Sequence, residues 1–152
     1  MIVRLVIGVV LTATLVAVAT PAMSTVRVDA ADSTVERQLT ALGDRLQRLV
    51  ATNYPTEGPG ARHVTTLRLP ERSVTSARVE SIRLENRAGV GTATWRVAGG
   101  PPERHRLVGV PFRARDGNLT LKDTGPHRLA FRFRSRSTGP VLTVRRLGGR
   151  SE

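Results

Sequence analysis

The chain contains no cysteine among its 152 residues. Disulfides, thiolate zinc sites, iron–sulfur clusters and cysteine nucleophiles are therefore excluded. Aromatic residues are also scarce, at 3% of the sequence. A hydrophobic core must then be built from Val, Leu, Ile and Ala, and the length allows one ordinary domain plus a targeting segment.

The signatures of common catalytic and metal sites are missing as well. The three histidines, His63, His105 and His127, do not have the spacing of zinc ligands, and there is no H-E-x-x-H sequence. A G-x-S-x-G elbow, a P-loop and a paired-carboxylate signature are also absent. We therefore predict a protein that is not an enzyme and that uses no metal and no cofactor.

Acidic residues are outnumbered two to one. There are 24 basic and 12 acidic residues, which gives a net charge of +12, and Lys122 is the only lysine among 23 arginines. A field of this sign favours anionic partners. Nucleic acid is not expected among them, because single-stranded readers interleave aromatic side chains with their cations and this chain has few.

One long uncharged run stands at the N-terminus. The 22 residues from Leu5 to Val26 carry no charge, and as a helix they are about 33 Å long, close to the hydrocarbon thickness of a bilayer. Residues 1–26 therefore predict a single membrane span, with the N-terminus in the cytoplasm and the rest of the chain outside. The alternative is a signal peptide cut after Ala17-Val18-Ala19, which gives a secreted protein.

Residues 33–53 predict an amphipathic helix. Ser33 and Glu36 form a capping-box pattern at its start, and Asn53 and Pro55 end it. Apolar residues recur at spacings of four and three along one stripe. The stripe either packs on a downstream sheet or contacts a partner helix. Its members are Val35, Leu39, Leu42, Leu46 and Leu49.

A linker at 54–60 leads into a region of period-two patterning at 61–148. Turn signals rich in Gly, Pro and Asp separate seven short stretches of this kind. The expected fold class is α+β, with an N-terminal transmembrane helix, a short amphipathic helix and a small antiparallel β-sandwich or barrel of about seven strands. The expected strands are Arg62–Leu69, Ser76–Leu84, Gly91–Val97, Arg104–Pro111, Leu119–Leu121, His127–Arg134 and Val141–Arg146.

Residues 127–136 show the alternation most clearly. Leu129, Phe131 and Phe133 fall on one face of the expected strand, which predicts the core side. The opposite face is a candidate surface for an anion or an acidic partner, formed by Arg128, Arg132, Arg134 and Arg136. Further arginines that are candidates to extend it are Arg96, Arg104, Arg106, Arg145 and Arg146.

Asn118-Leu119-Thr120 is an N-x-T tripeptide beside a predicted turn. It makes Asn118 a candidate N-glycosylation site if the domain is exported.

The order of anchor, helix and β domain resembles that of type IV pilins and pseudopilins. The prepilin-peptidase site of that family is absent, because Arg4 is followed by Leu5 and no acidic residue precedes Asp29. The stretches ARHVTTLRLPERSVTSARVE (61–80) and GPHRLAFRFRSR (125–136), with the anchor and helix, are similar to small uncharacterised one-span proteins of halophilic archaea. Those proteins tend to be encoded beside the ATPase and membrane platform of type IV pilus-like secretion systems.

The resemblance implies a non-enzymatic, membrane-anchored exported protein that is an accessory component of a pilus-like or secretion-associated surface assembly. Its partners would be the membrane and other proteins of that assembly. The alternative is a secreted β module that binds anionic glycan or lipid through its arginine-rich sheet face.

Overall fold

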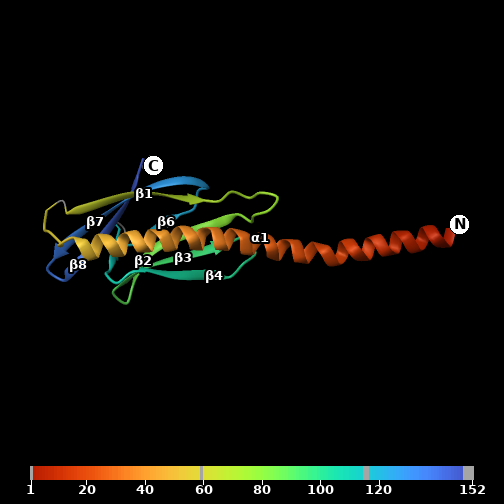
Figure 1. The fold of residues 1–152 in the computed structure, drawn as a ribbon, viewed down its shortest axis with the longest axis horizontal. Coiled ribbons are helices and arrows are strands. Elements are labelled where there is room, and N and C mark those ends of the chain that lie inside the picture. The colour runs from red at the N-terminus through yellow and green to blue at the C-terminus, as the bar shows by residue number, and fades with distance from the viewer. Residues whose placement is uncertain (1, 59, 115–116, 149–152) are drawn as a thin grey trace.

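A computed structural model describes the backbone of residues 2–58, 60–114 and 117–148, and the side chains within these ranges from residue 24 onward. The chain folds into one long helix and eight strands, an α+β arrangement in which the helix projects far beyond a compact β head (Figure 1). The elements are α1 (Ile2–Thr52), β1 (Ala61–Leu69), β2 (Val79–Arg87), β3 (Val90–Val97), β4 (Pro102–Val108), β5 (Phe112–Arg113), β6 (Leu119–Leu121), β7 (Gly125–Arg136) and β8 (Gly139–Leu147).

The helix α1 is continuous over 51 residues. The prediction of a separate helix that begins at Ser33 is therefore wrong, and Ser33 lies inside the helix. The residues before it include Ala30 and Ala31, which favour the helix, and neither Gly nor Pro interrupts residues 24–42. The Thr34 hydroxyl donates to the carbonyl of Ala30 at 2.8 Å, a bond within the helix at the point where a new N-terminus was expected.

Among the residues whose side chains are described, no helix is both long and apolar enough to cross a membrane. The predicted anchor or signal peptide at 1–26 lies almost entirely outside those residues.

The strands form two four-stranded sheets. The first sheet has the order β1-β7-β8-β5 and the second has the order β4-β3-β2-β6. All neighbouring strands are antiparallel except β5, which pairs parallel with β8. Each of the seven expected strands is present, with ends shifted by up to three residues. The eighth, β5, has only two residues and carries no periodic signal that could predict it.

The second half of α1 closes one open side of this sandwich. It packs mainly against β4, β1 and β3, so it fills the gap between the edge strands β1 and β4. The apolar stripe supplies the contact: Val35, Leu39 and Leu46 are fully buried in a core shared with both sheets. These side chains are not available to a partner helix, so that interpretation of the stripe is wrong.

Two glutamines on α1 satisfy backbone groups of the edge strands. The Gln38 amide accepts from the N–H of Arg68 at 3.0 Å and donates to its carbonyl at 3.1 Å, as a neighbouring strand would. Gln47 donates to the carbonyl of Leu107 in β4 at 3.3 Å. The two glutamines are nine residues apart, about two and a half turns, and therefore lie on opposite sides of the helix. The helix thus protects both edges from pairing with another chain.

A hydrogen bond between side chains fixes the helix against the second sheet. The indole Nε1 of Trp95 in β3 donates to a carboxylate oxygen of Asp32 at 2.5 Å. Trp95 is the only tryptophan in the chain and is buried. A buried indole N–H needs a partner, and α1 supplies it from the rim of the core.

Candidate functional site: an arginine-lined cleft

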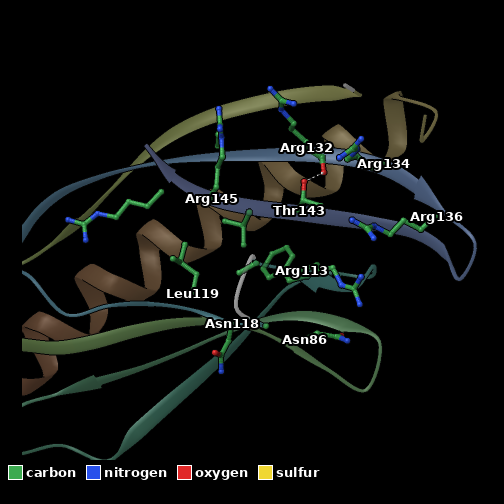
Figure 2. Close-up of a pocket in the computed structure, with 15 residues that line it drawn as sticks. Asn86, Arg113, Asn118, Leu119, Arg132, Arg134, Arg136, Thr143 and Arg145 are labelled. Atoms are coloured by element: carbon green, nitrogen blue, oxygen red, sulfur yellow. Dashed lines mark hydrogen bonds between the residues drawn. The ribbon is translucent and has the colours of Figure 1, made fainter. Parts of the chain in front are cut away.

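The opposite open side of the sandwich holds a cleft of about 1060 Å³. It extends along the β5 edge of the first sheet and is lined by residues of both sheets (Figure 2). We call it the arginine cleft. Its arginines are Arg113, Arg132, Arg134, Arg136, Arg145 and Arg146. The other lining residues are Asn86, Phe112, Ala114, Gly117, Asn118, Leu119, Ala130, Thr143 and Val144.

The strand register brings most of these arginines to one face. Arg132, Arg134 and Arg136 alternate along β7, so they project from the same side of the first sheet. Arg132 pairs with Thr143 of β8, and Thr143 pairs with Arg113 of β5. Neighbours in register share a face, so Arg113 joins the same basic surface across three strands.

The described residues that line the cleft include six arginines and no aspartate or glutamate. Asp116, which follows Arg115 near the cleft in sequence, lies outside the described residues. Six cations in one concavity raise the local positive potential and attract anions more strongly than the same charges on a convex surface.

Two of the six arginines have partners within the chain. Arg134 donates to the backbone carbonyls of Gly58 at 3.1 Å and Glu57 at 3.0 Å, and so holds the linker against β7. Arg146 pairs with Asp123 at 3.3 Å, in an ion pair that is largely exposed and therefore contributes little to stability. In the described part of the chain this is the only ion pair, so the described residues compensate little of the positive charge of the cleft.

Arg132 differs from Arg134 and Arg146 in its contacts. Its carbonyl accepts from the Thr143 hydroxyl at 3.3 Å, the bond drawn in Figure 2. Its Nε atom is buried and has no hydrogen-bond partner.

The arginines predicted from the sequence to form a basic face coincide only in part with those that line the cleft. Arg132, Arg134 and Arg136 line the cleft, whereas Arg128 lies at the other end of β7 and does not. Of the candidate extensions, Arg145 and Arg146 line it, but Arg96, Arg104 and Arg106 belong to the second sheet on β3 and β4. Arg113 was not foreseen, because nothing in the sequence marks two residues as a strand next to β8.

Asn118, the candidate glycosylation site, is exposed and lines the cleft. Modification of this residue remains a prediction, but its place has a consequence. A glycan on Asn118 would stand at the mouth of the cleft and would restrict access to the arginines.

The histidines lie in the strands and outside the cleft lining. His127 is buried, and its Nε2 is 2.6 Å from the carbonyl of Asp123, so that nitrogen carries the proton and donates. Burial, and then the nearby Arg45 guanidinium, lower the pKa of His63 below 6.5. Within the described ranges no group of three or more His, Asp and Glu side chains is placed to hold a metal ion.

Comparison with known proteins identifies a family but gives it no activity. No curated protein and no solved structure matches the chain. A family model described as a domain of unknown function, DUF7311, matches residues 2–147, which is nearly the whole chain. The match covers the long helix, both sheets and all the residues that line the arginine cleft. The chain therefore belongs to the DUF7311 family.

Proposed function

We propose that this protein is a non-enzymatic, membrane-anchored exported protein that acts as an accessory component of a pilus-like or secretion-associated surface assembly. In this proposal residues 1–26 stay in the membrane as a single span. The N-terminus faces the cytoplasm and the β head lies outside.

The observation that carries the proposal is the single helix α1. Its second half is built into the core of the head, and its first half projects from the head as a continuation of the same rod (Figure 1). The projecting half contains the uncharged run from Leu5 to Val26. A long uncharged helix of this kind is stable in a bilayer and costly in water.

The continuous helix also strengthens the likeness to pilins and pseudopilins. In that architecture an N-terminal helix anchors the subunit and packs a β domain at its far end. The prepilin-peptidase pattern is not found around Arg4 and Leu5, which favours an accessory role over that of a polymerising subunit.

Two exposed valines support the same orientation. Val26 lies on α1 where the helix leaves the head, and Val74 lies in the β1–β2 connection, which reaches along the helix toward the N-terminus in Figure 1. Both side chains are more than half exposed. Apolar side chains at this end of the head fit the interface of a membrane better than open water.

The test is the intact mass of the mature protein, measured separately from native membranes and from the medium. The proposal expects a mass near the full 16.5 kDa, found in membranes and co-purifying with other components of a surface assembly after mild cross-linking. A membrane-free species that begins near Thr20 or Met23 would overturn it. The protein would then be a secreted module, and binding of anionic glycan or lipid by the arginine-rich face would become its leading function.

A substitution at the candidate cleavage site sharpens this test. Ala19→Leu removes the small residue that a signal peptidase needs and leaves the apolar run intact. An anchored protein remains uncleaved and in the membrane with and without this change, and its mass differs only by the substitution itself. A secreted protein would shift from the medium to the membrane.

A further inference from the structure

The outer face of the first sheet extends the basic surface well beyond the cleft. Residues that are neighbours in register project to the same side of a sheet. Arg62 of β1 pairs with Arg132 of β7, and through Thr143 of β8 the same row reaches Arg113 of β5. Alternation along each strand adds the others. We call this surface the arginine face, and its arginines are Arg62, Arg68, Arg113, Arg128, Arg132, Arg134, Arg136 and Arg145.

The charge of the arginine face is of one sign. The four strands of this sheet, all within the described ranges, contain no aspartate or glutamate. Of the eight arginines only Arg132 and Arg134 are half-buried, and the others are exposed. Arg115 and Asp116, which follow β5 outside the described residues, add no net charge as a pair. The face therefore presents a strong positive potential to its surroundings.

The dimensions of the arginine face exceed those of one small anion. Strand residues advance by about 3.4 Å each, so Arg128 and Arg136 on β7 are about 27 Å apart along the strand. Arg62 and Arg113 are three strand spacings apart, or about 14 Å. A single phosphate or carboxylate contacts only neighbouring guanidinium groups at these spacings. A ligand that pairs with most of the eight arginines must be extended and must carry repeated negative charges.

The direction of α1 turns the arginine face away from a bilayer crossed by that helix. Gln38 hydrogen-bonds to the backbone of Arg68 in β1, and Arg45 donates to the Thr65 hydroxyl of the same strand. Seven helical residues and three strand residues each cover about 10 Å, so α1 and β1 run nearly parallel to one axis. The sheet therefore lies alongside the helix (Figure 1). A membrane around the projecting half of α1 would meet the end of the head and not this face.

The side chains of the arginine face also disfavour nucleic acid. Proteins that bind single strands stack the bases on aromatic side chains, and the three phenylalanines of these strands are buried on the opposite face of the sheet. Double-helical DNA is read by an element that enters a groove. The centre of this face is instead a sheet surface, where Val64, Ala130 and Thr143 stand between the arginines.

From this charge, extent and orientation we propose that the arginine face binds a linear acidic polysaccharide. The repeated carboxylates of the polymer pair with the arginine forks, which match carboxylate geometry. The positive face is a property of the head alone, but the choice of a polysaccharide rests on the exported location proposed above. The surface assembly would in this way have a partner that is not a protein.

The experiment uses the purified full chain in non-ionic detergent and an end-labelled oligomer of galacturonate. Binding is measured by anisotropy over a range of salt concentrations. The logarithm of the association constant should fall linearly with the logarithm of the salt concentration, because each ion pair releases counterions. Monomeric galacturonate at the same total carboxylate concentration should compete at least about tenfold less well than the unlabelled oligomer, because its charges are not linked.

A triple variant locates the site. Arg62→Gln, Arg128→Gln and Arg145→Gln remove exposed cations from three strands of the arginine face. Together they should weaken binding by about 10- to 100-fold, since each exposed ion pair contributes a factor of about two to five. The salt dependence should become shallower by up to about one unit of slope for each arginine removed.

A second triple variant is the matched control. Arg83, Arg96 and Arg104 are exposed on the outer face of the second sheet, and their replacement by Gln removes the same net charge. At about 0.1 M salt the Debye length is about 10 Å, so these distant positions are screened from the arginine face. The control should change binding by less than about twofold. Emission from Trp95 verifies that both variants are folded.

Four outcomes would overturn the inference. Equal losses in the two triple variants would show attraction to net charge alone. Competition by the monomer as strong as that by the oligomer would indicate a site for a small anion. Tighter binding of a DNA duplex with the same number of charges would assign the face to nucleic acid. Loss of oligomer binding on reconstitution into nanodiscs that contain anionic lipid would place the face on the membrane.

This test and the test of the anchor can fail separately. Intact mass decides whether residues 1–26 are retained, and binding in detergent decides whether the arginine face holds the polymer. Oligomer binding that is weakened in the face variant and kept in the control supports the inference.

Discussion

The two open sides of the sandwich show opposite solutions to the same packing problem. The side between β1 and β4 is apolar and is filled by α1, with Leu39 and Leu46 fully buried. The side beyond β8 is lined by arginines and stays open as a cleft. A sandwich edge must be either covered or made repulsive to its own kind. In this chain α1 covers the side between β1 and β4, and arginine side chains line the side beyond β8.

The sheets differ in charge as well. The strands of the first sheet contain nine arginines and no acidic residue, whereas those of the second sheet contain five arginines and three glutamates. Charge on the second sheet is therefore partly balanced within the sheet. The strands of the first sheet contain no acidic residue to balance their positive charge, which costs free energy through self-repulsion.

The largest effect on stability is expected from truncating a buried side chain between α1 and the two sheets. Leu39→Ala should lower the free energy of unfolding by about 2–5 kcal/mol, because it leaves a cavity between α1 and both sheets. Leu119→Ala at the cleft should cost less than about 1.5 kcal/mol, because Leu119 is only half-buried. Denaturant unfolding followed by Trp95 emission measures both. Equal losses at the two positions would remove the contrast between the sides.

The second effect concerns the connection from α1 to the first sheet. Gly60 has a φ of +65°, and a Cβ atom there would lie 2.1 Å from the carbonyl oxygen of Phe133. Gly60→Ala should therefore lower the free energy of unfolding by about 2–4 kcal/mol. Gly58→Ala is the control, since a Cβ at Gly58 meets nothing within 4 Å. A Gly60 variant as stable as the Gly58 variant would mean that the connection adapts freely.

The third effect tests how the helix is held against the second sheet. Asp32→Ala removes the acceptor of the Trp95 indole and should cost about 1–2 kcal/mol. Asp29→Ala, an exposed position on the same helix, should stay within about 0.5 kcal/mol. A double-mutant cycle with Trp95→Phe isolates the pair. A coupling energy near zero would contradict a stabilising role for this bond.

The fourth effect is smaller and depends on salt. Arg145→Gln removes one cation from the uncompensated cluster, so thermal stability at low salt should rise slightly, by a few tenths of a kcal/mol. The gain should disappear near 0.5 M salt, where the Debye length falls to about 4 Å. Arg83→Gln on the second sheet shares its surroundings with Glu80 and Glu85 and should show no such gain. A gain that persists at high salt would point to packing instead of charge.

The smallest effect is a dependence on pH. The pKa of His63 is lowered in the folded state by burial and by Arg45, so below pH 6.5 the unfolded chain binds the proton more readily. Stability from this group is complete above pH 6.5 and declines as the pH falls from 6.5 toward the lowered value. His63→Gln should flatten the curve of unfolding free energy against pH in that window. An unchanged slope would assign the dependence to other groups.

Local patterns in the sequence predicted most of the fold. Alternation placed Leu129, Phe131 and Phe133 in the core, where they are buried, and the spacing of the helical stripe identified its buried face. The start of the helix was misjudged, because Ser33 and Glu36 match a capping box whether or not the chain is already helical. Local rules could not reveal that the residues before Ser33 continue the same helix.

The site was harder to predict than the fold. Alternation along one strand identified Arg132, Arg134 and Arg136, which line the cleft. Arg113 reaches the same face only through the register of β5 with β8, a pairing between distant parts of the chain. The cleft likewise depends on how distant strands are arranged, and no pattern within a single segment encodes it.

The placement of α1 in the core also sets an order of events during synthesis. The helix is made first and β8 last, yet the stretch from Ala31 to Leu46 is part of the wall against which the strands pack. The core of the β head cannot be completed until the last strands are synthesised, and until then α1 must stay close to the strands already made. If the anchor is retained, the membrane holds that segment in place during the wait. The span would then serve as a scaffold for folding before it serves as an attachment.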